Sequence, residues 1–125
     1  MLRACNRVLK PGAPLAFYVV AVSDGLSSGD TARAIEAGPP HVDARASYRE
    51  LVEAAGFVDV EVVDVTDDYA ATMSKAIRMR GEASVELGEL IGSDRYVEGQ
   101  ASRRRELDAI RGGLLRRFLI STARP

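Results

Sequence analysis

The sequence predicts an α/β fold in which helices flank a sheet of three strands. Residues 15–22 form an unbroken apolar run, rich in β-branched side chains and too short for a typical helix. In residues 58–65 valine alternates with acidic residues, which is typical of a strand with one buried and one wet face. A third apolar segment, 114–122, follows a pair of glycines. Helical patterns separate the three segments, so we expect one small domain spanning residues 1–125.

Composition and charge exclude several classes of protein. Hydrophobic residues make up 46% and charged residues 28% of the chain, as in an ordinary globular domain. The 17 basic and 18 acidic side chains nearly cancel, so no basic field draws the chain to nucleic acid or to an anionic membrane. One cysteine and one histidine cannot build an internal disulfide or a typical zinc site of about four ligands. The longest apolar run is far shorter than the roughly 20 residues that cross a bilayer, and no signal peptide opens the chain. We therefore expect a cytoplasmic protein with no metal, nucleic-acid or membrane partner.

The first element is a helix. Leu2, Cys5 and Leu9 recur at helical spacing, and Pro11-Gly12 ends the pattern. The pattern is already running at Met1 without a capping residue, so we expect the chain to begin inside an element.

The strand that follows, residues 15–22, has no polar face. Such runs are typical of strands covered on both faces by helices. Residues 23–46 are then polar and rich in glycine and proline, with one short helical possibility at 30–37. Long excursions of this kind are often functional or mobile.

The next helix has the clearest boundaries. Ser47 and Glu50 have the spacing of a capping box, and Gly56 fits the left-handed position after the helix. The half-wet strand 58–65 follows it directly, and its pattern suits a place near a sheet edge.

The last third of the chain alternates helices with glycines. Thr66, Asp67 and Asp68 offer caps for a helix at 69–80. A second helix ends near Gly92, and a third is expected at 94–111. Gly112-Gly113 then separates this helix from the final strand, 114–122.

Three segments resemble the class I S-adenosylmethionine-dependent methyltransferases. Residues 2–12, LRACNRVLKPG, are similar to the helix and turn before the family's fifth strand, where the turn commonly reads RVLKPGG; Ala13 replaces the last glycine. Residues 48–57, YRELVEAAGF, are similar to the helix that ends in AGF before the sixth strand. Residues 114–125 look like the seventh strand. The three matches stand in the family's order and cover nearly the whole chain.

The resemblance implies a partial Rossmann-like methyltransferase fold. Its three-stranded mixed sheet would place 114–122 between 15–22 and 58–65, antiparallel to both. The family's cofactor, S-adenosylmethionine, lies on a glycine-rich turn after the first strand, with an acidic residue after the second strand holding the ribose. No strand followed by a GxG turn and a helix occurs in this sequence. We therefore expect no cofactor-binding residues and no cofactor bound to this chain alone.

Four residues are candidates for contact with a substrate, and none is assigned a catalytic role. Ser23 and Asp24 come just after the strand 15–22, where open α/β sheets place their ligand crevices, although Ser-Asp-Gly is also an ordinary turn. His41 lies in the excursion 23–46, which by resemblance covers the substrate pocket like a lid, or is an exposed loop histidine. Tyr69 either lines the same pocket by resemblance or packs in the core. Tyr18, inside the strand, is expected in the core.

Three functions stay open. The chain is part of a small-molecule methyltransferase, inactive by itself, or a non-enzymatic methyltransferase remnant that binds a partner, or an unrelated α/β interaction module. In the family the strand that matches 15–22 also pairs with a fourth strand, which this sequence does not contain. Its edge would be open, so we expect a homodimer through strand 15–22 or a complementary methyltransferase half.

Overall fold

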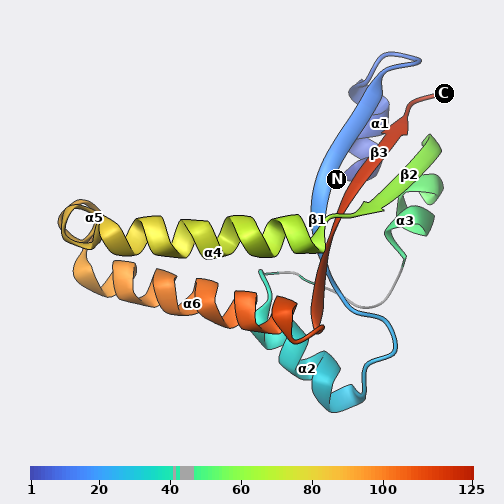
Figure 1. The fold of residues 1–125 in the computed structure, drawn as a ribbon. Coiled ribbons are helices and arrows are strands. Elements are labelled where there is room, and N and C mark those ends of the chain that lie inside the picture. The colour runs from blue at the N-terminus through green and yellow to red at the C-terminus, as the bar shows by residue number, and fades with distance from the viewer. Residues whose placement is uncertain (41, 43–46) are drawn as a thin grey trace.

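The computed structural model describes residues 1–40, 42 and 47–125, so His41 lies outside the described residues. Figure 1 shows the elements in chain order, and their bounds are α1 (Leu2–Val8), β1 (Pro14–Val22), α2 (Ser28–Ala37), α3 (Tyr48–Ala54), β2 (Val58–Asp64), α4 (Thr66–Glu82), α5 (Ser84–Ile91), α6 (Ser93–Arg111) and β3 (Leu115–Ala123). All three predicted strands and all the predicted helices are present, with boundaries that shift by a few residues.

The sheet has the predicted order. The last strand, β3, lies between β1 and β2 and is antiparallel to both. β1 and β2 therefore run in the same direction as each other and opposite to β3, so both pairings in the sheet are antiparallel. The register places Val20 opposite Arg117 and Tyr18 opposite Leu119. In the described chain both β1 and β2 are edge strands, as the half-wet pattern of β2 predicts.

One face of the sheet is covered by α1 and α3. Its core contains Val52, Phe57 and Ile120, which are almost completely buried. Partly buried residues of α1 and of β1, among them Leu2 and Phe17, pack around this core. On this face, therefore, the first helix, α1, packs against the same core as α3, from the middle of the chain.

The other face is covered only at one end of the sheet. There α2, α4 and α6 pack against the last residues of β1 and the first of β3, around Val22, Leu107 and Leu115. From this base α4 and α6 run side by side away from the sheet and are joined at their far ends by α5 (Figure 1). We call residues 66–111 the arm. No helix in the described ranges is long and apolar enough to cross a membrane.

The expectation that β1 is covered on both faces is wrong for most of the strand. Ala21 and Val22 are buried, but Ala16 is exposed and Tyr18 has 56% of its surface exposed, which also contradicts its predicted place in the core. The reason is the direction of the arm, which meets the sheet only at the carboxyl end of β1 and then leaves it (Figure 1).

Two predictions of helix ends are also corrected. The helix α3 begins after Ser47 as expected, but the Ser47 side chain makes no capping hydrogen bond, so no capping box forms. The helix α4 starts earlier than predicted, because the carboxylate of Asp64 accepts a hydrogen bond of 2.9 Å from the Thr66 amide and so supports the first turn. The predicted left-handed Gly56 is confirmed, with φ of +90°.

Candidate functional site

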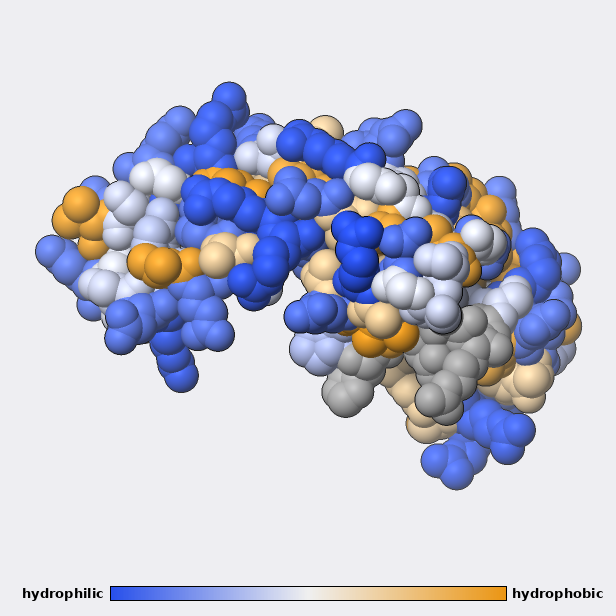
Figure 2. Space-filling view, turned by 90° about the horizontal axis from the view of Figure 1, so that it is seen from below, coloured by the Kyte–Doolittle hydropathy of each residue, from blue (hydrophilic) through white to orange (hydrophobic). Residues whose placement is uncertain are grey.

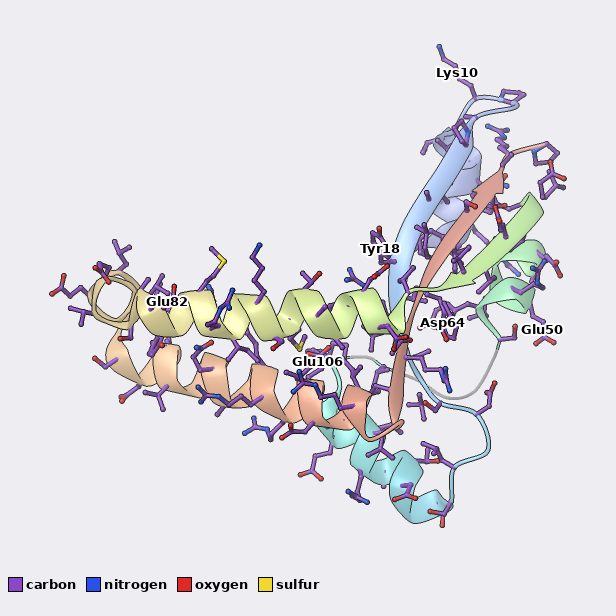
Figure 3. The ribbon with its side chains drawn as sticks, viewed as in Figure 1. Lys10, Tyr18, Glu50, Asp64, Glu82 and Glu106 are labelled. Carbon is purple, nitrogen blue, oxygen red and sulfur yellow. The ribbon has the colours of Figure 1, made fainter. Side chains whose placement is uncertain are left out.

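Two tyrosines and an arginine form the best-defined polar cluster of the structure, at the place where the arm meets the sheet. The guanidinium carbon of Arg117, on β3, lies 4.3 Å from the centre of the Tyr18 ring and 4.1 Å from that of Tyr69. The two rings come from β1 and from the start of α4. We call these three residues the tyrosine–arginine stack; Figure 3 shows its Tyr18 projecting from β1 on the side where the arm leaves the sheet.

The backbone register explains why these side chains meet. Arg117 is opposite Val20 on β1, so its side chain leaves the sheet on the same face as that of Tyr18, two residues earlier on the same strand. The amide of Arg117 also donates a hydrogen bond of 3.0 Å to the Thr66 hydroxyl. This bond fixes the first turn of α4 to β3 and brings Tyr69, one turn later, over the guanidinium.

The hydroxyl of Tyr69 is held by the second long helix of the arm. It donates a hydrogen bond of 3.1 Å to Oε1 of Glu106, on α6. Burial, together with the neighbouring Glu106 carboxylate, raises the pKa of Tyr69 to about 12. The hydroxyl is therefore protonated at neutral pH, and Tyr69 links β3 to both helices of the arm.

A second polar group lies on the opposite face of β3. Oδ2 of Asp64 is 3.0 Å from the guanidinium of Arg116, and Oδ1 accepts hydrogen bonds from the amide and hydroxyl of Thr66. The Thr66 hydroxyl is the main cause that lowers the pKa of Asp64 below its ordinary value, with partial burial opposing it and the Thr66 amide and Arg116 adding to it. Asp64 is thus an ionised anchor for the end of β2.

The structure places the predicted candidates in different surroundings. Tyr69 belongs to the stack. Asp24 is exposed in a turn with Gly25, and the Ser23 amide donates a hydrogen bond of 3.0 Å to the Leu114 carbonyl. The Ser23 hydroxyl oxygen is buried and has no hydrogen-bond partner in the described part of the chain. Among the described residues, no hydrogen bond, ion pair or ring contact joins Ser23 or Asp24 to the stack. His41 is outside the described residues.

Sequence patterns missed Arg117 and Glu106. Glu106 lies in a charged helix and looks like part of a solvated face. A signal for Arg117 does exist, because Arg116-Arg117 interrupts an otherwise apolar strand.

Two hollows flank the base of the arm: one of about 580 Å³ is lined by Asp64, Asp68 and Arg116 among others, and one of about 710 Å³ lies between α2 and α6. Among the described residues, no group of three or more histidine, cysteine or acidic side chains could hold a metal ion.

Comparison with solved structures identifies the fold. No family model and no curated protein matches the sequence. By structure, the chain is similar to a phosphoethanolamine N-methyltransferase from Haemonchus contortus, with a TM-score of 0.80 over 99% of this chain at 15% identity. It is similar to a protein described as a sarcosine dimethylglycine methyltransferase from Galdieria sulphuraria, with a TM-score of 0.81 over 98% at 18% identity. A cyclopropane synthase from Mycobacterium tuberculosis matches with a TM-score of 0.71 over 98% at 13% identity.

The chain has a methyltransferase fold. The neighbours that carry this fold are S-adenosylmethionine-dependent methyltransferases and a related synthase. The predicted strand order is confirmed by the sheet of this chain. The matched part is a fragment of each neighbour, since the chain spans 29%, 46% and 48% of their respective lengths.

The nematode enzyme was solved with S-adenosylhomocysteine and with S-adenosylmethionine. In this chain the connection from β1 to α2 carries the left-handed Gly25, with φ of +73° and nothing within 4 Å of the place where a β-carbon would lie.

Proposed function

We propose that this chain is the C-terminal part of an S-adenosylmethionine-dependent methyltransferase that acts on a small molecule. The proposal is carried by one observation: nearly the whole chain superposes on less than half of each methyltransferase neighbour. In the proposed enzyme the cofactor site lies on another segment, N-terminal to β1 in the complete fold. The proposed enzyme is cytoplasmic; its one cysteine cannot form an internal disulfide of the kind common in secreted proteins.

The chain would contribute a wall and a cover to the acceptor site. The sulfonium of the cofactor is already activated, so much of the catalysis lies in aligning the acceptor and excluding water. The arm provides a rigid cover, because Tyr69, Thr66 and Gln100 tie its helices to β3 and to each other. The exposed face around Ala16 and Tyr18 provides a surface against which the cofactor-bearing part can pack.

The first test is cofactor binding. We expect the 125-residue chain alone to bind S-adenosylmethionine no more tightly than about 1 mM, because the missing glycine turn and ribose carboxylate each supply hydrogen bonds of about 1 kcal/mol or more. Mixing it with a segment that contains a glycine-rich strand, turn and helix from the coding sequence upstream should restore micromolar binding and methyl transfer. Calorimetric titration measures the dissociation constant of the cofactor for the chain alone and for the mixture. Micromolar binding by the chain alone would contradict the assignment of the cofactor site.

A second candidate function is a non-enzymatic remnant that exists as a homodimer. The observation that favours it is the apolar outer edge of β1, which no described strand covers. In this case no upstream segment would restore cofactor binding, and the homodimer would persist after such a segment is added.

A further inference from the structure

The guanidinium of Arg117 is held in place but has no anionic partner among the described residues. Its two faces are occupied by the Tyr18 and Tyr69 rings, at 4.3 and 4.1 Å. Stacking engages the faces of the planar group and leaves its N–H donors pointing outward in the plane. None of these donors makes a hydrogen bond or ion pair with a described residue. The structure therefore fixes a cation and leaves its hydrogen-bonding edge free.

Two other arginines of the chain, unlike Arg117, form ion pairs with carboxylates. Arg116, the next residue on β3, is 3.0 Å from Asp64, and Arg33 is 2.9 Å from Asp30. The carboxylate nearest to the stack along the hydrogen-bond network, Glu106, accepts from the Tyr69 hydroxyl and is not within ion-pair distance of Arg117. A half-buried arginine that has lost part of its hydration without gaining a carboxylate is suited to take one from a ligand.

The stack can be reached from outside. Tyr18 has 56% of its surface exposed, whereas the Glu106 carboxylate, on α6, is hydrogen-bonded to the other ring of the stack, Tyr69. An anion that approached over Tyr18 would meet the free edge of the guanidinium without passing the Glu106 carboxylate. A fork of parallel N–H donors matches the two oxygens of a carboxylate or phosphate.

We propose that Arg117, held between Tyr18 and Tyr69, binds an oxyanion: the carboxylate or phosphate group of the methyl acceptor. That the anion belongs to a methyl acceptor rests on the function proposed above, whereas the binding of an anion does not. The two rings act as positioning groups, because they restrict the orientation of the guanidinium before the ligand arrives.

The test uses nitrogen-15-labelled 125-residue chain and follows the arginine side-chain Nε–H signals by NMR. Sodium phosphate and sodium acetate are titrated separately, at constant ionic strength. We expect the Arg117 signal to shift saturably, with a dissociation constant of about 1 to 10 mM for at least one anion, as suits a single-arginine site. The stronger of the two titrations identifies the chemical class of the acceptor group.

Matched variants separate a site from general charge attraction. Arg117→Gln should abolish the saturable shift in the remaining spectrum, and Arg116→Gln, the neighbouring cation on the opposite face of β3, should leave it unchanged. Arg117→Lys keeps the charge without the planar fork and should weaken binding at least threefold. If Arg117→Gln fails to fold by its backbone spectrum, the lysine variant carries the comparison.

Three results would overturn the proposal: equal, linear shifts of all arginine signals, saturable binding that survives in Arg117→Gln, or wild-type affinity in Arg117→Lys. Each would mean that the stack only fastens the arm to the sheet. Because these titrations contain no cofactor, their outcome is independent of whether the reconstituted protein transfers a methyl group.

Discussion

Single residues at turns carry constraints that a local pattern can reveal. Gly56 follows α3 with φ of +90°, a conformation that costs a residue with a side chain about 1 to 2 kcal/mol. A β-carbon at this position would also lie 3.4 Å from the side-chain nitrogen of Asn6, on α1. This distance is an ordinary van der Waals contact, so the left-handed turn is the main reason for glycine at position 56.

We expect Gly56→Ala to lower the free energy of unfolding by about 1 to 2 kcal/mol, measured by urea denaturation. Gly81→Ala is the matched control. Gly81 lies within α4 without a left-handed φ, and a β-carbon there meets nothing within 4 Å, so alanine should stabilise the helix by about 0.5 to 1 kcal/mol. Equal effects of the two substitutions would show that the left-handed turn is not the constraint.

At the scale of elements, the side chains of the arm are buried where it meets the sheet and exposed at its far end. Leu107 of α6 is 5% exposed and belongs to the core shared with β1, α2 and β3. Leu90, in α5, is 80% exposed. Figure 2 shows further apolar surface at this far end, and the side chains there that are exposed include Met79, Val85, Leu90, Ile91 and Val97.

Leu107→Ala should cost about 2 to 5 kcal/mol, because it leaves a cavity where the arm joins the sheet. Leu90→Ala removes the same atoms from a side chain that is mostly in water, and should change the free energy of unfolding by less than about 0.5 kcal/mol. Thermal and urea unfolding of both variants provide the comparison. A large loss in Leu90→Ala would instead reveal that the tip of the arm is buried in solution, against another molecule.

For the whole molecule, we propose that the sheet edge at β1 determines association. One edge of this apolar strand pairs with β3, and the other has no partner strand in the described chain. Unpaired backbone N–H and C=O groups on such an edge are a template for another strand. A second copy that pairs its own β1 across a two-fold axis would satisfy both edges at once.

We expect the isolated chain to be a homodimer, with a mass in light scattering of about twice 13.5 kDa. Ala16→Lys places a charge on the exposed side of β1 and should give a monomer. Ala32→Lys, at an exposed position of α2, should leave the dimer intact. Val20, in the same strand, is a less suitable position for a lysine, because its side chain packs against the core. A well-folded wild-type monomer at micromolar concentration would contradict the open-edge prediction. Addition of the cofactor-bearing segment should replace the homodimer by a heterodimer.

The sequence by itself determined the elements and, through its resemblance to a family, their arrangement. Pro11-Gly12 and Gly112-Gly113 separate helix from strand because their backbone preferences act locally, whatever the rest of the chain does. The order β1-β3-β2 came from the matched segments and not from periodicity, since three apolar runs are compatible with several pairings.

Only the tertiary structure decided which side chains meet and which faces stay open. Tyr18 lies in an apolar run that resembles a buried strand, yet it is exposed because the arm leaves the sheet before reaching it. Arg117 meets Tyr18 through the register of β3 on β1, and it meets Tyr69 because Thr66 fixes α4 to the same strand. These contacts join residues far apart in the chain, and the angle between the arm and the sheet sets them. No local propensity encodes that angle, so the tyrosine–arginine stack could be found only in three dimensions.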